Sequence, residues 1–341
     1  MSEEGEKIKR MKKTNVLAVL ALAATPVFLH AQTNYSDVVG YQTAPIVVGL
    51  NSLSVPFLEP VLTGSVQTNN ATSLTINSPV GSLLNSSSSY YVEVKSGSNV
   101  GERFDIDVPA TIAANSSQVV INTTSGNNTT TLSGLTLNGE SVVVAKHFTL
   151  GDFAGRLSLP LTATASVSTS DSFGLFDAGA LVFYYARPDG SFKKIGNPAD
   201  FKDTVIPPGS GVLYRRNGTT NQITTTGVVR DTSFARNLST GQQLVANPFP
   251  VDRTPVAFGM IPGSGLSDWT GGASASTGDY VTIVENGALV RFGLRTDGSI
   301  RRVGNPADFK NTEILPSGQA FIVNRARAST DALESSPIAG N

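Results

Sequence analysis

Cysteine is absent from the 341-residue sequence, and charged residues make up only 15% of it. The lack of cysteine excludes disulfides, thiolate metal sites, a cysteine nucleophile and a lipidated N-terminal cysteine. An average soluble protein has roughly 25% charged residues, whereas here Gly, Ser, Thr and Asn fill the gaps between short apolar runs. This balance predicts short strands joined by many turns.

The first 31 residues are interpreted as a secretory signal peptide. Lys12 and Lys13 precede an apolar run at residues 16–29, and Leu29-His30-Ala31 resembles a signal-peptidase cleavage site. A transmembrane anchor is the alternative, but this run is shorter than the ~20 apolar residues that a span needs, and a proline interrupts it. We therefore predict an exported protein that resides in the periplasm, on the outer surface or outside the cell.

Removal of this segment leaves a weakly acidic chain. The segment contains five basic and three acidic residues of the 25 and 26 in the whole sequence, so the remainder has a formal net charge of −3. Binding to nucleic acid requires clustered Lys and Arg, and we predict no such partner and no integral membrane segment after signal removal. An acidic leader, residues 1–10, leaves open whether Met1 or Met11 is the true start.

Histidine is also scarce. His147 is the one histidine after residue 31, so a metal site or a triad built on several histidines is impossible, and Ser-His-Asp catalysis would rest on this residue alone. The sequence lacks G-x-S-x-G, G-x-x-x-x-G-K-[ST] and H-E-x-x-H, the motifs of many hydrolases, nucleotide-binding proteins and zinc enzymes. We predict no cofactor, no metal site and no assigned catalytic residue.

A glycosidase needs only two carboxylates, but nothing in the sequence places two acids together. In "ERFDIDV", at residues 102–108, apolar residues alternate with Arg103, Asp105 and Asp107, as expected for a strand with one solvated face. Asp105 and Asp107 are therefore interpreted as solvated charges rather than as a metal-binding pair.

A repeated unit organises the second half of the chain. Residues 168–206 and 276–314 align without gaps at an offset of 108, with 20 identities in 39 pairs. Each copy has an Asp-Gly dipeptide between two apolar runs, which predicts a hairpin. We predict an all-β protein with tandem β-sandwich or β-barrel-like domains and an internal duplication. The predicted divisions are a signal peptide (1–31), an N-terminal β domain (32–150), two β modules (151–235 and 236–328) and a C-terminal tail (329–341).

The heptapeptide "GNPADFK" occurs in both copies, at residues 196–202 and 304–310. Asn before Pro has the order of a helix N-cap followed by the first helical residue, and Asp200 or Asp308 lies three residues after that cap. The segment therefore predicts one helical turn, with Phe201 or Phe309 buried at the end of a sheet.

A ligand is the alternative explanation of this segment. Asp200 and Asp308, with the turn residues Asp189 and Asp297, could bind Ca²⁺ or a sugar hydroxyl. The run of oxygen ligands that is typical of a calcium loop is missing, however. Asp200 and Asp308 are therefore weak candidates for a metal site.

The two hairpins differ on one face. The set predicted to point inward is Val182, Tyr184 and Ala186 in the first copy and Val290, Phe292 and Leu294 in the second. The opposite face then carries Leu181, Phe183 and Tyr185 in the first copy, but Leu289, Arg291 and Gly293 in the second. The exposed aromatics predict an interface between modules, and Phe183 and Tyr185 are the candidate ligand-binding residues if the face instead stacks on a glycan or binds a partner.

The motifs "LVANPF", "KHFTLGDF", "LVFYYARPDGSF" and "VIPPGSGVLYRR" resemble those of an uncharacterised family of exported bacterial all-β proteins with repeated N-P-F and I-x-P-G-x-G modules. The resemblance covers most of Val39–Arg325. The second unit departs from it with "LPSGQAF" and with a longer insert at Pro250–Ala275 that contains Trp269. The resemblance implies export and a β fold, and it implies no activity.

The sequence thus predicts an exported, non-enzymatic structural or binding protein, with a cell-envelope glycan or another exported protein as its partner. The alternative is a polysaccharide-active enzyme or a glycan-binding accessory protein. Two carboxylates about 5–10 Å apart in a cleft would distinguish the enzyme.

Overall fold

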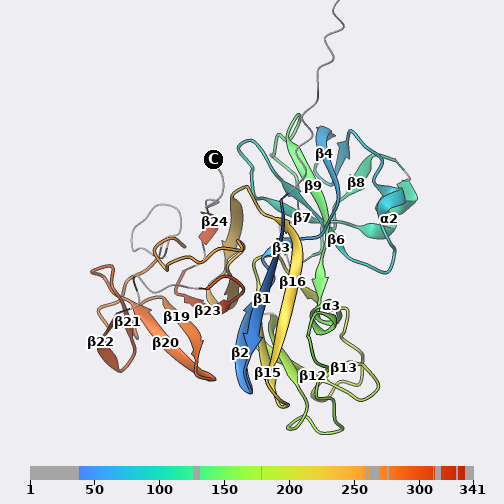
Figure 1. The fold of residues 1–341 in the computed structure, drawn as a ribbon. Helices are drawn as coiled ribbons and strands as arrows, with labels where there is room; N and C mark the ends of the chain where they lie inside the picture. Colours follow the sequence, from blue (N-terminus) through green and yellow to red (C-terminus); the bar gives the residue numbers. More distant parts are fainter. Residues whose placement is uncertain are drawn as a thin grey trace, which may run out of the picture. The chain divides into compact units, whose positions relative to one another are not determined.

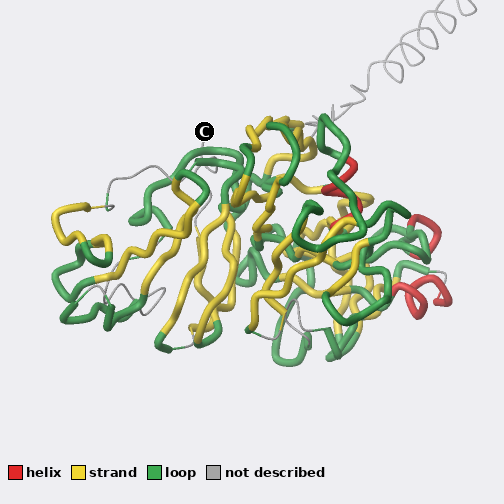
Figure 2. The backbone as a smooth tube through the Cα atoms, turned by 90° about the horizontal axis from the view of Figure 1, so that it is seen from below, coloured by secondary structure: helices red, strands yellow, loops and turns green. Residues whose placement is uncertain are grey.

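Strands dominate the fold of the computed structural model, as predicted from the sequence (Figures 1 and 2). The structure describes residues 38–334 apart from 115, 126–130, 178, 259, 261–268, 275, 310, 312–315 and 328. The predicted signal peptide and residues 335–341 of the predicted tail lie outside the described residues.

Short antiparallel strands follow one another along almost the whole chain, with little helix between them. The strands are β1 (Val39–Ile46), β2 (Gly49–Ser54), β3 (Phe57–Leu58), β4 (Pro60–Asn69), β5 (Ser73–Ile76), β6 (Tyr90–Val94), β7 (Arg103–Asp105), β8 (Gln118–Val120), β9 (Ser141–Lys146), β10 (Phe148–Thr149), β11 (Ser172–Asp177), β12 (Ala180–Ala186), β13 (Phe192–Lys194), β14 (Val205–Ile206), β15 (Gly211–Arg216), β16 (Asn221–Val229), β17 (Phe234–Leu238), β18 (Gly241–Ala246), β19 (Tyr280–Glu285), β20 (Ala288–Leu294), β21 (Ile300–Arg302), β22 (Asn305–Phe309), β23 (Ala320–Arg325) and β24 (Ser329–Glu334). The helices are η1 (Gly81–Leu83), α2 (Val108–Ala114) and α3 (Leu150–Gly155).

Three larger sheets each cover a separate apolar core. The N-terminal sheet has the order β7-β6-β9-β4-β5-β8, the central sheet β13-β12-β11-β15-β2, and the C-terminal sheet β18-β23-β19-β20-β21-β22. Phe104 is buried in the first core, Phe153 in the second and Phe292 in the third. A further cluster, which includes Leu213 of β15 and Ile322 of β23, packs the central and C-terminal sheets against each other.

The first strands of the chain pair with strands far along the sequence. β2 pairs with β15, and β1 pairs with β16 over eight residue pairs. In Figure 1, β1 and β16 accordingly lie side by side although they are near opposite ends of the first two thirds of the chain. Residues 60–146, which form the N-terminal sheet, are therefore inserted between strands of the central part.

The repeated sequence forms matching hairpins. Strands β19, β20 and β21 begin and end at positions 108 residues after those of β11, β12 and β13. The Asp-Gly turns have glycines at positive φ, Gly190 at 81° and Gly298 at 79°, which confirms the predicted hairpins. In each turn the aspartate, Asp189 or Asp297, accepts hydrogen bonds from the serine two residues later.

The helical turn predicted over "GNPADFK" is wrong, and the two copies differ. In the first copy the N–H of Phe201 donates to the carbonyl of Phe192, in the hairpin, instead of to a preceding residue of a helix. Asp200 accepts from the N–H groups of Phe192 and Lys202, at 2.9 and 3.0 Å. In the second copy residues 305–309 form β22, which pairs with β21. The polar side chains therefore stabilise a bend in the first copy, whereas identical residues, 305–309, extend the sheet in the second copy.

The solvated face predicted for "ERFDIDV" is also wrong. β7 ends at Asp105, and both Arg103 and Asp105 are buried. Their partners come from distant parts of the chain, since Arg103 donates to the carbonyl of Ala235 and Asp105 contacts His147. Asp107 accepts from the N–H of Ala110 at the start of α2, so the third residue of this set has a capping role.

Candidate ligand-binding site

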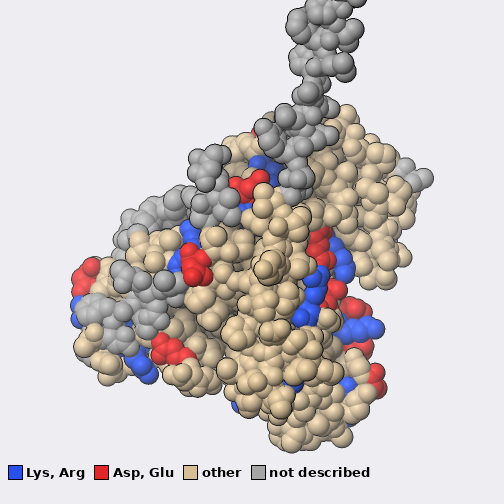
Figure 3. All heavy atoms as spheres, in the orientation of Figure 1, with Lys and Arg blue, Asp and Glu red and all other residues tan. Residues whose placement is uncertain are grey.

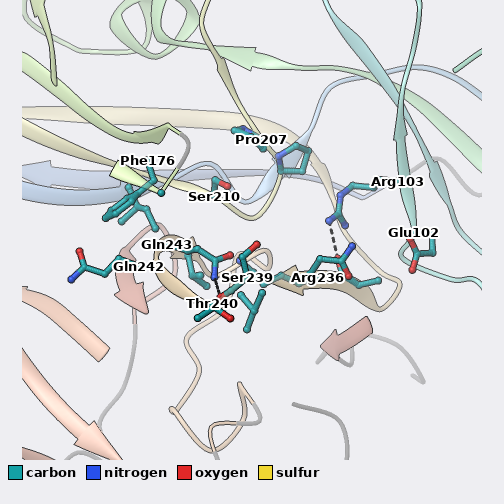
Figure 4. Close-up of a pocket in the computed structure, with 17 residues that line it drawn as sticks. Glu102, Arg103, Phe176, Pro207, Ser210, Arg236, Ser239, Thr240, Gln242 and Gln243 are labelled. Atoms are coloured by element: carbon teal, nitrogen blue, oxygen red, sulfur yellow. Dashed lines mark hydrogen bonds between the residues drawn. The ribbon is translucent and has the colours of Figure 1, made fainter. Parts of the chain in front are cut away.

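A polar cavity of about 440 Å³ lies beside β17, and we call it the β17 cavity (Figure 4). Its walls come from all three large sheets and the strands between them: Arg103 from β7, Phe176 from β11, Ser210 before β15, Arg236 from β17, and Gln242 and Gln243 from β18. Its volume falls within the roughly 300–1,000 Å³ that is usual for ligand pockets. The cavity therefore exists only because strands distant in sequence are packed together.

Three arginines surround one buried phenylalanine, and two of them, Arg103 and Arg236, line this cavity. The ring of Phe234 is fully buried, and the guanidinium carbons of Arg103, Arg230 and Arg236 lie 3.8, 4.7 and 5.1 Å from its centroid. Each distance is within the range of a cation–π contact. The ring thus holds three positive charges close together in a poorly solvated place.

Different groups hold the three guanidinium groups. Arg230 makes a two-pronged ion pair with Glu93, at 3.2 and 2.7 Å. Arg103 donates to the carbonyls of Gly101 and Ala235, at 2.9 and 2.8 Å. Arg236 donates to the carbonyls of Gly209 and Ala246, at 2.6 and 2.9 Å. The bonds of Arg103 and Arg236 thus connect β17 to β7, to the turn before β15 and to β18.

Burial has an electrostatic cost for Arg103. Loss of solvation lowers the pKa of its guanidinium to about 10; the carboxylate of Glu93 opposes this change, and the charges of Arg230 and Arg236 add to it. The buried Nε of Arg103 has no hydrogen-bond partner among the described residues. An Arg has five N–H groups, so the two carbonyls leave three of those of Arg103 for another acceptor.

The ionisable groups beside the three arginines are neutral or negatively charged. Burial, assisted by Glu93, raises the pKa of Tyr91 well above its usual value, so this phenol stays neutral. Glu102 is half-buried and supplies the one carboxylate among the described residues that line the cavity. On the face seen in Figure 3, Lys and Arg elsewhere lie next to Asp and Glu in small groups. Arg103 and Arg236 both contribute positive charge to the cavity wall.

The predicted ligand-binding residues Phe183 and Tyr185 are not among the residues that line the β17 cavity. Both are half-buried on β12. The ring of Phe183 lies over Gly174, where a Cβ would come within 2.9 Å of it, and Tyr185 lies 5.5 Å from the guanidinium of Arg187. Their role as a ligand surface remains a prediction.

The inward and outward faces of the hairpins are as predicted. Tyr184 and Ala186 are buried in the central core, and Phe292 and Leu294 are buried in the C-terminal core. Leu181, from the outward set, packs in the cluster between the central and C-terminal sheets. An inter-module contact therefore accounts for part of the apolar outer face.

His147 belongs to a buried polar cluster. Its Nε2 lies 2.9 Å from Asp105, and Ser125 donates a hydrogen bond to the same carboxylate. In a catalytic triad the imidazole stands between the hydroxyl and the carboxylate, whereas here Asp105 stands between His147 and Ser125. The buried Nδ1 of His147 has no partner among the described residues, and the cluster lacks the order that activates a serine.

Asp200, the weak metal candidate whose side chain the structure describes, belongs to no cluster of acids. Across the described residues, no group of three or more His, Cys, Asp and Glu side chains could hold a metal ion. Asp200 accepts from the backbone N–H groups of Phe192 in β13 and of Lys202, and the side chain of Asp308 lies outside the described residues. Nor does the described part of the chain contain a helix long and apolar enough to span a membrane.

A comparison of two substitutions tests the role of the first heptapeptide. Phe201 is half-buried and lies 5.4 Å from the ring of Tyr184, so we expect Phe201→Ala to lower the free energy of unfolding by about 2 kcal/mol. Asp200→Asn keeps one acceptor oxygen, and we expect a loss of about 0.5–1 kcal/mol. Urea unfolding measures both, and Ca²⁺ should leave the melting temperature unchanged. A calcium-dependent rise that Asp200→Asn abolishes would establish a calcium site instead.

A scan against protein-family models and searches of curated proteins and of solved structures found no significant match to this chain. The cavity residues must therefore be interpreted from their own chemistry. None of them was predicted from the sequence as a ligand-binding residue, although "RDTSFAR", at residues 230–236, places two arginines on either side of Phe234. That local pattern is the one signal available, because Arg103 joins it from more than a hundred residues away.

Proposed function

We propose that the protein is an exported, non-enzymatic binding protein of the periplasm, outer surface or extracellular matrix, and that its ligand occupies the β17 cavity. The observation that carries this proposal is Arg103, a buried arginine that lines a cavity of about 440 Å³ and whose hydrogen bonds to protein go to neutral carbonyl oxygens. A guanidinium buried in this way is costly in a protein interior. A site that binds ligand explains the placement of Arg103 at a cavity wall, and the signal-like sequence at residues 12–31 supports export.

An enzyme that acts on polysaccharide is the competing proposal. Glycoside hydrolysis needs two carboxylates on either side of the scissile bond, and Glu102 is the single acid among the described lining residues. The cluster of His147, Asp105 and Ser125 has the carboxylate in the middle. Both observations favour binding over turnover.

Obstruction of the cavity tests the proposal. Thr240 lines the cavity and is exposed, so Thr240→Trp should fill the opening without disturbing a core. The mature protein is incubated with peptidoglycan, with extracellular polysaccharide and with a cross-linker in the presence of cell-envelope proteins. We expect at least one of these to be retained by the unmodified protein and lost in Thr240→Trp.

The matched control is Thr220→Trp, at an exposed turn outside the cavity lining, which should retain the ligand. Release of reducing ends is assayed in the same incubations. Steady release that Glu102→Gln abolishes would overturn the non-enzymatic proposal, and retention that survives Thr240→Trp would overturn the placement of the ligand.

A further inference from the structure

We infer that the β17 cavity binds an acidic oligosaccharide, with a sugar carboxylate held by Arg103 and with the sugar hydroxyls held by the hydroxyl side chains of the turn between β17 and β18 and by the amide side chains of β18. This inference rests on the proposed function and adds the chemical class of the ligand. It does not use the aromatic residues Phe183 and Tyr185, which lie outside the cavity lining.

The charge of the ligand follows from Arg103. This residue is buried, and both of its hydrogen bonds to protein go to neutral carbonyl oxygens. Glu93, the nearest buried carboxylate in the cluster, already has both oxygens on Arg230. A planar carboxylate is the acceptor that best fits a guanidinium with unused N–H groups, because it can take two of them at once.

The remaining groups indicate a sugar rather than a compact acid. Ser210, Ser239, Thr240, Gln242 and Gln243 line the cavity in addition to the arginines. Hydroxyl and amide side chains both donate and accept hydrogen bonds, as the hydroxyls of a sugar require. A small dicarboxylate would form hydrogen bonds with only a few of these side chains. Figure 4 labels these side chains together with Phe176 around the cavity.

Phe176 supplies the apolar surface that a sugar ring also needs. It is half-buried at the end of β11, and part of its side chain packs in the cluster between the central and C-terminal sheets. The remainder contributes to the cavity lining. An aromatic ring with one apolar face free can take the C–H face of a pyranose, while the polar side chains bind its edge.

Isothermal titration calorimetry tests the inference with four probes on the mature full chain: trigalacturonate, its fully methyl-esterified form, a neutral galactose trisaccharide and a tri-glutamate peptide. We expect trigalacturonate to bind at least 10-fold more tightly than either neutral probe. Its affinity should fall as NaCl rises from 50 to 300 mM, since the added contact is between charges.

Glu102→Gln is expected to increase affinity, a result that loss of folding could not produce. Removing the one lining carboxylate should tighten the binding of trigalacturonate several-fold and leave the neutral trisaccharide unchanged, because only the acid is repelled by Glu102. Arg103→Lys keeps a charge without the planar fork and should weaken trigalacturonate binding at least 5-fold. Lys193→Gln, a change of charge outside the lining, should change neither.

The outcomes separate this inference from the proposed function. Equal binding of the ester and the acid, or tighter binding of a tri-glutamate peptide than of trigalacturonate, would overturn the acidic-sugar assignment while the retention assay with Thr240→Trp still succeeds. Absence of binding in both assays would overturn the inference and the proposed function together.

Discussion

Replacement of Asp171 by Asn is expected to lower the free energy of unfolding by about 3–5 kcal/mol, the range for breaking a buried ion pair. The carboxylate of Asp171 is fully buried and accepts from Arg216 at 2.6 Å and from the Tyr214 hydroxyl at 2.8 Å. It also accepts from the N–H groups of Thr162 and Asn217, at 2.9 and 2.7 Å. The substitution keeps the side-chain shape and leaves the buried Arg216 without its counterion. Urea unfolding of the mature chain measures the loss.

The matched control is Asp177→Asn. This carboxylate forms an ion pair of 3.0 Å with Lys194, but its side chain is 54% exposed. Exposed pairs contribute about 0–1 kcal/mol, so the loss should lie in that range. Equal losses for the two variants would show that the Asp171 network is not a main determinant of stability.

Phe153→Ala is expected to cost about 3–5 kcal/mol, as for other fully buried aromatic side chains. Phe153, in α3, is fully buried, and its ring centroid lies 5.5 Å from that of Phe173 and 6.2 Å from that of Tyr214. A capping box between Thr149 and Asp152 fixes the short helix that carries it. The cavity left by the ring would be surrounded by rigid aromatic groups, which limits its collapse. Thermal and urea unfolding measure the effect.

Phe183→Ala is the control for this prediction, since Phe183 is half-buried on the outer face of the same sheet. Truncation of this side chain removes a ring that is only partly buried, and we expect the free energy of unfolding to fall by less than about 1.5 kcal/mol. A loss as large as that of Phe153→Ala would mean that the outer face of β12 contributes as much as the core to stability.

Local patterns predicted the hairpins, and distant contacts explain the errors. Asp-Gly turns and alternating apolar residues are properties of a few neighbouring residues, so the hairpin around Gly190 and the inward side chains of β12 could be predicted. Arg103 and Asp105 also alternate, but their partners, Ala235 and His147, lie 132 and 42 residues away. No local pattern distinguishes a solvated charge from one that a distant strand will cover.

The heptapeptides show the same limit within one sequence motif. Phe192 in the first copy bonds to Asp200 of its heptapeptide, whereas its counterpart Ile300 bonds to Asn311, just beyond the second heptapeptide. Residues 305–309 form a strand, whereas the identical residues 197–201 do not. The β17 cavity was beyond sequence reasoning for a related reason, because its lining is assembled from three sheets.

The pairing of β1 and β2 with strands near residue 220 determines when the protein can fold as the chain is made. These strands emerge first, yet β15 and β16, which complete their hydrogen bonding, are synthesised only after the whole N-terminal sheet. Sequence-distant pairing of this kind slows folding and leaves strand edges open meanwhile. A chain that stops before residue 211 would contain β1 and β2 but neither of their partners, β15 and β16. The N-terminal sheet can therefore form before the central sheet is complete.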